Sequence, residues 1–145
     1  MAVETSGAAR RTPTSAWPSV VDAAGSIPLV DRVGLDQLEA MVSRERLSTL
    51  IATSIAEAER SCAVMTALAA PSETRAPAPS EELAREAHNL SGVSGVLRLT
   101  RISQLTKEIE ARARTASRVE PLLAELKELV PATAAELRRL GLMRD

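Results

Sequence analysis

The sequence has few of the residues on which many binding and redox sites depend. Among 145 residues it has no tyrosine or phenylalanine, one tryptophan, one cysteine and one histidine. With almost no aromatic side chains to stack on nucleic-acid bases, and with basic residues that form no stripe, we expect no nucleic-acid binding. A single cysteine excludes an internal disulfide bond, which fits a reducing, cytoplasmic setting.

Long hydrophobic runs are absent too. No stretch approaches the roughly 20 apolar residues that span a membrane, and the N-terminus lacks the apolar segment of a secretion signal, so we expect no membrane segment. The formal net charge is −1, which attracts neither nucleic acid nor anionic lipid. One histidine and one cysteine cannot supply the converging ligands of a metal site. No glycine-rich phosphate-binding loop is evident, so we expect no cofactor.

Leucine and alanine are abundant, and both favour helix over strand. Apolar residues recur every three or four positions, which predicts a short helix followed by four long ones. The long helices are expected at about residues 44–69, 80–98, 100–116 and 119–140. Short links between such helices favour an all-α fold, an antiparallel four-helix bundle with the short helix added at its N-terminal side.

The chain divides into two regions. Residues 1–28 have no sustained periodicity and contain three helix-breaking prolines, which predicts a flexible N-terminal tail. Residues 29–145 form the predicted bundle domain, interrupted by a proline-rich loop at 71–79. We expect a monomer, because the long helices show no obvious second apolar face.

Several residues have specific expected positions. The expected N-caps are Asp31 or Asp36 for the short helix, Ser80 and Thr100. Inward-facing positions include Met41, Leu50 and Cys62, and we interpret Cys62 as a small core residue rather than a reactive thiol. Pro131 should kink or split the last helix.

The histidine, His88, lies within the predicted helix 80–98. Its helical neighbours at positions three, four and seven further on are Ser91, Gly92 and Gly95. The apolar stripe of this helix lies about 100° away, so His88 should be exposed beside small residues. Two glycines inside a helix cost about 2 kcal/mol, and either tight helix packing or the close approach of a large partner would explain them. Gly92 suits the second explanation better, and Gly95 suits either.

The chemistry open to His88 is limited by its surroundings. Ser91 is near along the helix, but a nucleophilic triad also needs a pocket and an oxyanion-stabilising element, and neither is evident. The carboxylate-bridged metal bundles need Glu-x-x-His pairs, and the spacing of Glu86 and His88 is wrong for one. What remains is an exposed imidazole that itself reacts, since neutral imidazole near pH 7 is a good nucleophile.

The sequence around His88 contains Ala-His-Asn-Leu-Ser-Gly-Val-Ser at residues 87–94, followed by Leu97, Leu105 and the Glu-Ile-Glu-Ala-Arg-Ala run at 108–113. This pattern resembles the histidine-containing phosphotransfer (HPt) domain. The resemblance covers about residues 29–140. It implies that His88 accepts a phosphoryl group from a receiver-domain aspartyl phosphate and passes it to another receiver in a two-component phosphorelay. The implied partners are response-regulator receiver domains and a sensor or hybrid histidine kinase.

The resemblance also implies a phosphoryl carrier without ATP-dependent kinase activity, and any Mg²⁺ used in transfer belongs to the receiver. The residues expected around the phosphoryl group and partner are Arg85, Asn89, Ser91, Gly92 and Gly95. Gly92 matches the family glycine that makes room for the partner.

Two positions depart from the family pattern. The usual lysine three residues after the histidine is Ser91 here, whose hydroxyl could give one weaker hydrogen bond, while Arg85 could supply the missing charge. The glycine expected after Leu97 is Arg98, which puts that turn in question. Two other functions remain possible. The chain could be a module that docks on a receiver or kinase without transferring phosphate, or a helical scaffold in which His88 has no chemical role.

Overall fold

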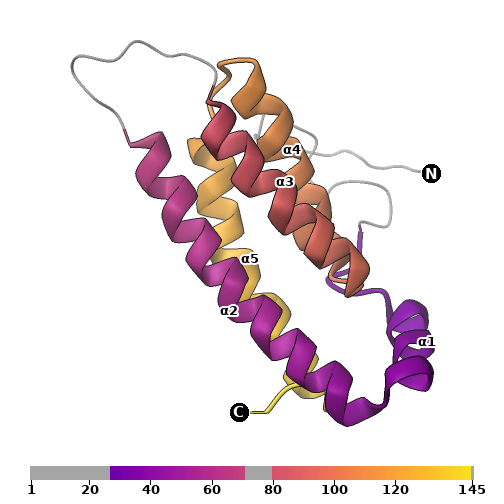
Figure 1. Cartoon of the computed structure of the whole chain (residues 1–145). Helices are drawn as coiled ribbons and strands as arrows, with labels where there is room; N and C mark the ends of the chain where they lie inside the picture. Colours follow the sequence, from indigo (N-terminus) through magenta and orange to yellow (C-terminus); the bar gives the residue numbers. More distant parts are fainter. Residues whose placement is uncertain (1–26, 71–79, 145) are drawn as a thin grey trace, which may run out of the picture.

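The computed structural model describes residues 27–70 and 80–144, and every regular element in these ranges is a helix. The helices are α1 (Arg32–Val42), α2 (Arg44–Ala69), α3 (Glu81–Val96), α4 (Thr100–Arg114) and α5 (Glu120–Arg139) (Figure 1). The all-α prediction is therefore confirmed. The expected loop at 71–79, and the expected tail apart from Ile27 and Pro28, lie outside the described residues.

Four of the helices form an antiparallel bundle in which each packs on two neighbours. Helix α2 packs on α3 and α5, and α4 packs on the same two helices. The backbone N–H of Ser80, just before α3, donates to the carbonyl of Ala113 in the last turn of α4 (2.9 Å). Arg44 at the start of α2 donates to the carbonyl of Leu140 just after α5 (2.8 Å). Helix α1 packs on α2, outside the bundle, at the end where α2 begins (Figure 1).

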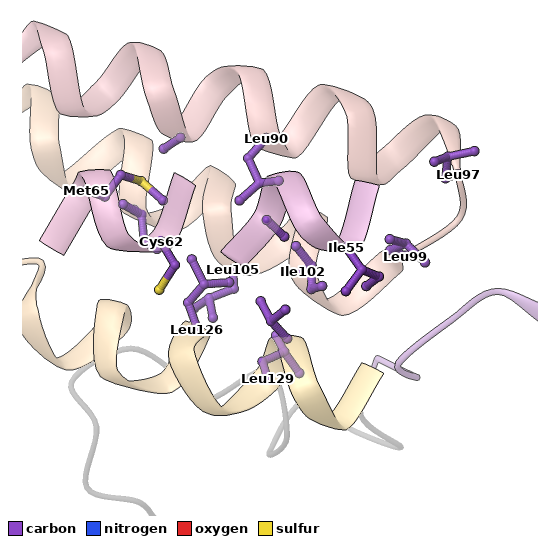
Figure 2. Close-up of a cluster of buried hydrophobic side chains, with 14 of the residues drawn as sticks. Ile55, Cys62, Met65, Leu90, Leu97, Leu99, Ile102, Leu105, Leu126 and Leu129 are labelled. Carbon is purple, nitrogen blue, oxygen red and sulfur yellow. The ribbon is translucent and has the colours of Figure 1, made fainter. Parts of the chain in front are cut away.

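The core lies between the four long helices. All four contribute aliphatic side chains to it, including Ile55, Met65, Leu90, Ile102, Leu105, Leu126 and Leu129 (Figure 2). Cys62 is buried among them, and burial raises the pKa of its thiol despite a hydrogen bond with Thr66. The interpretation of Cys62 as a core residue is confirmed. Among the residues described, no helix is both long enough and apolar enough to cross a membrane.

Two residues expected to face inward are exposed. Leu50 is 44% exposed and Met41 is 77% exposed. Both lie at the edge of an apolar stripe, and periodicity identifies residues that share a face without fixing how much of that face a neighbour covers. The helix ends also differ slightly: α3 ends at Val96, α4 at Arg114 and α5 at Arg139.

The cap predictions are partly right. Asp31 accepts a hydrogen bond from the backbone N–H of Gly34 (3.0 Å), and Ser80 accepts one from that of Leu83 (3.2 Å). Thr100 is not a cap, because it is the first residue of α4 and its hydroxyl donates to the carbonyl of Pro28 (2.8 Å). Pro131 does not split α5, which continues through it.

The turn from α3 to α4 keeps a conformation typical of glycine although it holds Arg98. The N–H of Leu99 donates to the carbonyl of Ser94 (2.8 Å), and that of Arg98 to Gly95 (3.1 Å). This is the Schellman arrangement, whose left-handed position usually holds glycine; Arg98 has φ +65°. The substitution therefore leaves the turn geometry intact, and α3 and α4 are separate helices as predicted. The carbonyl of Arg98 also accepts from the N–H of Asp31 (2.9 Å), which ties the start of α1 to this turn.

Candidate functional site

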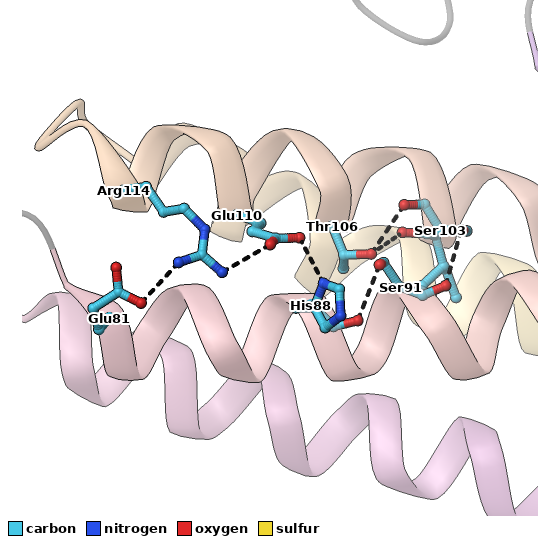
Figure 3. A network of polar contacts seen from close by, with 8 residues as sticks. Glu81, His88, Ser91, Ser103, Thr106, Glu110 and Arg114 are labelled. Atoms are coloured by element: carbon cyan, nitrogen blue, oxygen red, sulfur yellow. Dashed lines mark hydrogen bonds and ion pairs between the residues drawn. The ribbon is translucent and has the colours of Figure 1, made fainter.

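His88 projects from the edge of α3 that borders α4 (Figure 3). Its side chain is 66% exposed, whereas Ala87 and Leu90 beside it are buried. The Ser80 cap and two acidic residues in the first turn, Glu81 and Glu82, stabilise the start of this helix. The predicted exposure of the histidine is thus confirmed, and it stands on a regular helix rather than on a loop.

A chain of charged side chains connects His88 to α4. Nδ1 of His88 lies 3.2 Å from Oε1 of Glu110. The other carboxylate oxygen of Glu110 accepts from Nη2 of Arg114 (3.0 Å), and Nη1 of Arg114 donates to Glu81 on α3 (2.7 Å) (Figure 3). The histidine is therefore held by a carboxylate whose own position is fixed by an arginine.

The protonation of this pair follows from the surroundings of Glu110. Its side chain is only 20% exposed, and burial alone would raise its pKa. Hydrogen bonds from Arg114 and His88, together with their charges, outweigh burial and lower the pKa of Glu110 below its ordinary value near 4.5. Glu110 is consequently ionised at neutral pH and can only accept hydrogen bonds, so the proton of a neutral His88 belongs on Nδ1. The lone pair is then on Nε2, which makes no hydrogen bond with any described residue.

Ser91 is placed differently from the expectation. It is 6% exposed, and its hydroxyl donates to the backbone carbonyl of His88 (3.0 Å). Its own carbonyl accepts from the hydroxyl of Ser103 on α4 (3.0 Å). Ser91 is thus part of the contact between α3 and α4, and its hydroxyl is already bonded to its own helix. The expectation that this hydroxyl anchors a group on Nε2 stays a prediction, and it requires the hydroxyl to leave the carbonyl of His88.

The two glycines of α3 have different surroundings. A Cβ atom placed on Gly92 would meet no heavy atom within 4 Å, so packing within the described chain does not require a glycine there. A Cβ on Gly95 would lie 3.3 Å from Oγ of Ser103, which is tighter than ordinary contact. Gly95 therefore serves the close packing of α3 on α4, while Gly92 leaves open space beside His88.

The outer face of α3 continues this open surface. Val93 and Val96 are 47% and 69% exposed, and Asn89 is exposed too. Arg85 is exposed one turn before His88. At a spacing of three residues, Arg85 and His88 are neighbours on the helix surface. The area around His88 therefore combines an exposed imidazole with a gap at Gly92, and Val96 is exposed one turn beyond that gap.

Glu110 is the site residue for which the sequence had suggested no role. It lies in the 108–113 run, and its spacing of four residues to Arg114 indicated an ion pair on a helix face. That it faces His88 depends on the register between α3 and α4, which no local pattern gives. Within residues 27–70 and 80–144 no group of three or more histidine, cysteine, aspartate or glutamate side chains could hold a metal ion.

Comparison with known proteins adds one match. The family model described as Hpt domain matches residues 49–136, which include α3, α4 and most of α2 and α5. Comparisons with curated proteins and with solved structures find no significant match.

Proposed function

This chain belongs to the Hpt domain family, and we propose on that premise that His88 is the residue that carries the phosphoryl group. Domains of this family transfer phosphoryl groups through a histidine in phosphorelays, and they interact with receiver domains and kinases. His88 accepts the group from the aspartyl phosphate of one receiver and gives it to the aspartate of another. The observation that carries the proposal is the exposed imidazole whose Nδ1 is held by Glu110 while Nε2 is free to react.

The reaction can be written for this geometry. The lone pair on Nε2 of His88 attacks phosphorus, the P–O bond to the receiver aspartate breaks, and its electrons remain on the leaving carboxylate. No proton needs to move, because Nδ1 keeps its hydrogen and the phosphorylated ring becomes cationic. The Glu110 carboxylate, 3.2 Å from Nδ1, stabilises that positive charge. The reverse attack by a second aspartate regenerates neutral imidazole.

The surface around His88 suits a protein donor. A receiver must bring the phosphorus of its aspartyl phosphate to within about 3–3.5 Å of the nucleophile before reaction. The open space at Gly92 permits this approach, and Val96, one turn further along α3, offers apolar contact area beside it. Glu110 then acts as a positioning residue, because it fixes the imidazole and does not touch the phosphoryl group.

Transfer from a receiver or hybrid kinase phosphorylated with labelled phosphate tests the proposal. The purified chain should acquire a label that is stable in alkali and lost in acid, as expected of phosphohistidine, and His88→Gln should acquire none. Glu110→Gln should be labelled more slowly than wild type, because a neutral amide stabilises the cationic ring less.

Ser91 favours a second candidate function. The buried Ser91, whose hydroxyl donates to the carbonyl of His88, leaves α3 without a cation at the family's lysine position. A chain that binds a receiver or kinase without transferring phosphate would share this feature. Partners that bind wild type and His88→Gln equally, with no label on either, would favour that docking function and contradict phosphotransfer.

A further inference from the structure

One edge of α4 lies against α3 beside His88. The polar residues on this edge, spaced by four, three and four positions, are Ser103, Lys107, Glu110 and Arg114. Ser103 donates its hydroxyl to the carbonyl of Ser91, and Glu110 bonds to Nδ1 of His88. Lys107 is one turn from each of these two contacts. It therefore lies on the border of α4 next to the stretch of α3 between His88 and Ser91.

Lys107 is exposed, and it makes no ion pair or hydrogen bond with any residue in the described ranges. The nearby arginine on the same edge is already engaged, since Arg114 binds Glu110 and Glu81. A lysine side chain is a flexible four-carbon stem that carries a point charge, so its ammonium group can move to an anion on its side of the helix.

A phosphoryl group on His88 creates a need for such a charge. It brings close to two negative charges beside the ionised Glu110, whose own cation is shared with Glu81. On α3 the family's lysine position holds the buried Ser91, and the exposed Arg85 lies one turn before His88. On the edge of α4 beside His88, the cation without a partner among the described residues is Lys107, which lies level with the stretch of α3 between His88 and Ser91.

We propose, resting on the phosphotransfer function above, that the ammonium group of Lys107 binds the phosphoryl group carried on Nε2 of His88. The positive charge that the family pattern places on the histidine's own helix is then supplied here from α4. The absent side chain of Gly92 leaves space on the opposite side of the phosphoryl group for the receiver. Lys107 contacts the transferred group, whereas Glu110 acts through the ring.

The test requires no cognate partner. Potassium phosphoramidate phosphorylates exposed histidines, and phosphorus NMR of the full-length chain follows the titration of the phosphoryl group between about pH 5.5 and 9. A nearby cation favours the dianion and lowers the pKa of the phosphoryl group. Lys107→Ala should raise this pKa by about 0.7 pH unit, the value for unit charges roughly 4 Å apart in water. Lys107→Arg should keep most of the wild-type value.

The sequence offers a matched control, because Lys127 is its only other lysine. Lys127 is exposed on α5, which packs on α2 and α4 and not on α3. Lys127→Ala should leave the titration unchanged. An equal shift in Lys107→Ala and Lys127→Ala would reflect net charge alone and overturn the proposal.

Failure of the inference and failure of the proposed function give different results. If wild type forms phosphohistidine at His88 but Lys107→Ala titrates like wild type, the role of Lys107 is refuted and phosphotransfer stands. A shift in Arg85→Ala with none in Lys107→Ala would assign the charge to Arg85 and likewise refute it. If phosphoramidate yields no phosphohistidine on wild type, or the same signal on His88→Gln, the phosphoryl-carrier function itself is contradicted.

Discussion

Replacing Gly92 should make the protein more stable and less active. Gly92 lies inside α3, and a Cβ atom there would meet no heavy atom within 4 Å. Alanine is about 1 kcal/mol more favourable than glycine in a helix interior, and nothing at this site opposes the gain. Gly92→Ala should therefore raise the free energy of unfolding by about 1 kcal/mol. For a domain of this size that raises the melting temperature by about 3–4 °C.

The second glycine of α3 provides the comparison. A Cβ atom at Gly95 would lie 3.3 Å from Oγ of Ser103, whose hydroxyl is bonded to the carbonyl of Ser91. The same gain in helix propensity is offset there by displacement of Ser103. Gly95→Ala should accordingly stabilise less than Gly92→Ala, and urea and thermal denaturation measure both. A destabilised Gly92→Ala would refute the conclusion that this position is open.

The functional cost at Gly92 should grow with side-chain size. Gly92→Gln keeps a good helix former but places a long side chain on the surface where we propose that the receiver approaches His88. Transfer from a phosphorylated receiver should be slower than in wild type and slower than in Gly92→Ala. Ala132→Gln, at an exposed position of α5, adds the same side chain away from α3 and should transfer normally. Wild-type transfer by Gly92→Gln would show that the partner does not use this space.

Three further results are expected. Glu110 has a pKa below its ordinary value, so its ionised form stabilises the folded state above about pH 4.5, and this contribution is lost as the pH falls through the lowered pKa. Urea denaturation from pH 6 to 3 should therefore show that the free energy of unfolding depends less on pH in Glu110→Gln than in wild type, and an unchanged dependence would contradict the pairing. Ala116 and Arg98 have φ +60° and +65°, so Ala116→Gly should raise the free energy of unfolding by about 1 kcal/mol. Arg98→Gly should also stabilise the protein, because Nε of Arg98 is buried without a hydrogen-bond partner among the described residues. Lower melting temperatures for these variants would argue against strain at the two turns. Cys62 is buried with a raised thiol pKa, so a thiol reagent near pH 7.5 should label the native protein far more slowly than the protein unfolded in urea, and equal rates would refute its burial.

The sequence predicted the helices well because the signals that define them are local. The apolar stripe of α3 is a repeat of three and four residues, and all its members, Leu83, Ala87, Leu90, Ser94 and Leu97, are buried. Ser80 and Asp31 cap their helices through contacts three residues away. Both features can be predicted from the sequence because they depend only on the geometry of a single helix.

The details of the site depend on how two helices meet. Whether Ser91 points outward or into the α4 contact, and whether Glu110 or another polar residue reaches His88, follows from the register and spacing of α3 and α4. The residues that set the spacing between α3 and α4 are small, and the sequence alone does not show which residues of the other helix they face. Leu50 shows the same limit, since its exposure depends on how far the neighbouring helices extend over α2.

The contact between α3 and α4 links the packing of the bundle to the chemistry at His88. Close approach is permitted where Gly95 faces Ser103, and the hydroxyl of Ser103 fixes the register by its bond to the carbonyl of Ser91. At that register Glu110 lies 3.2 Å from Nδ1, a distance that leaves little tolerance because hydrogen bonds weaken beyond it. A larger side chain at Gly95 would push the helices apart and weaken the hold on the ring without touching it. Gly95, which serves packing, therefore positions the imidazole of His88, while Gly92, which serves no packing, leaves the open space in which we propose that the receiver docks.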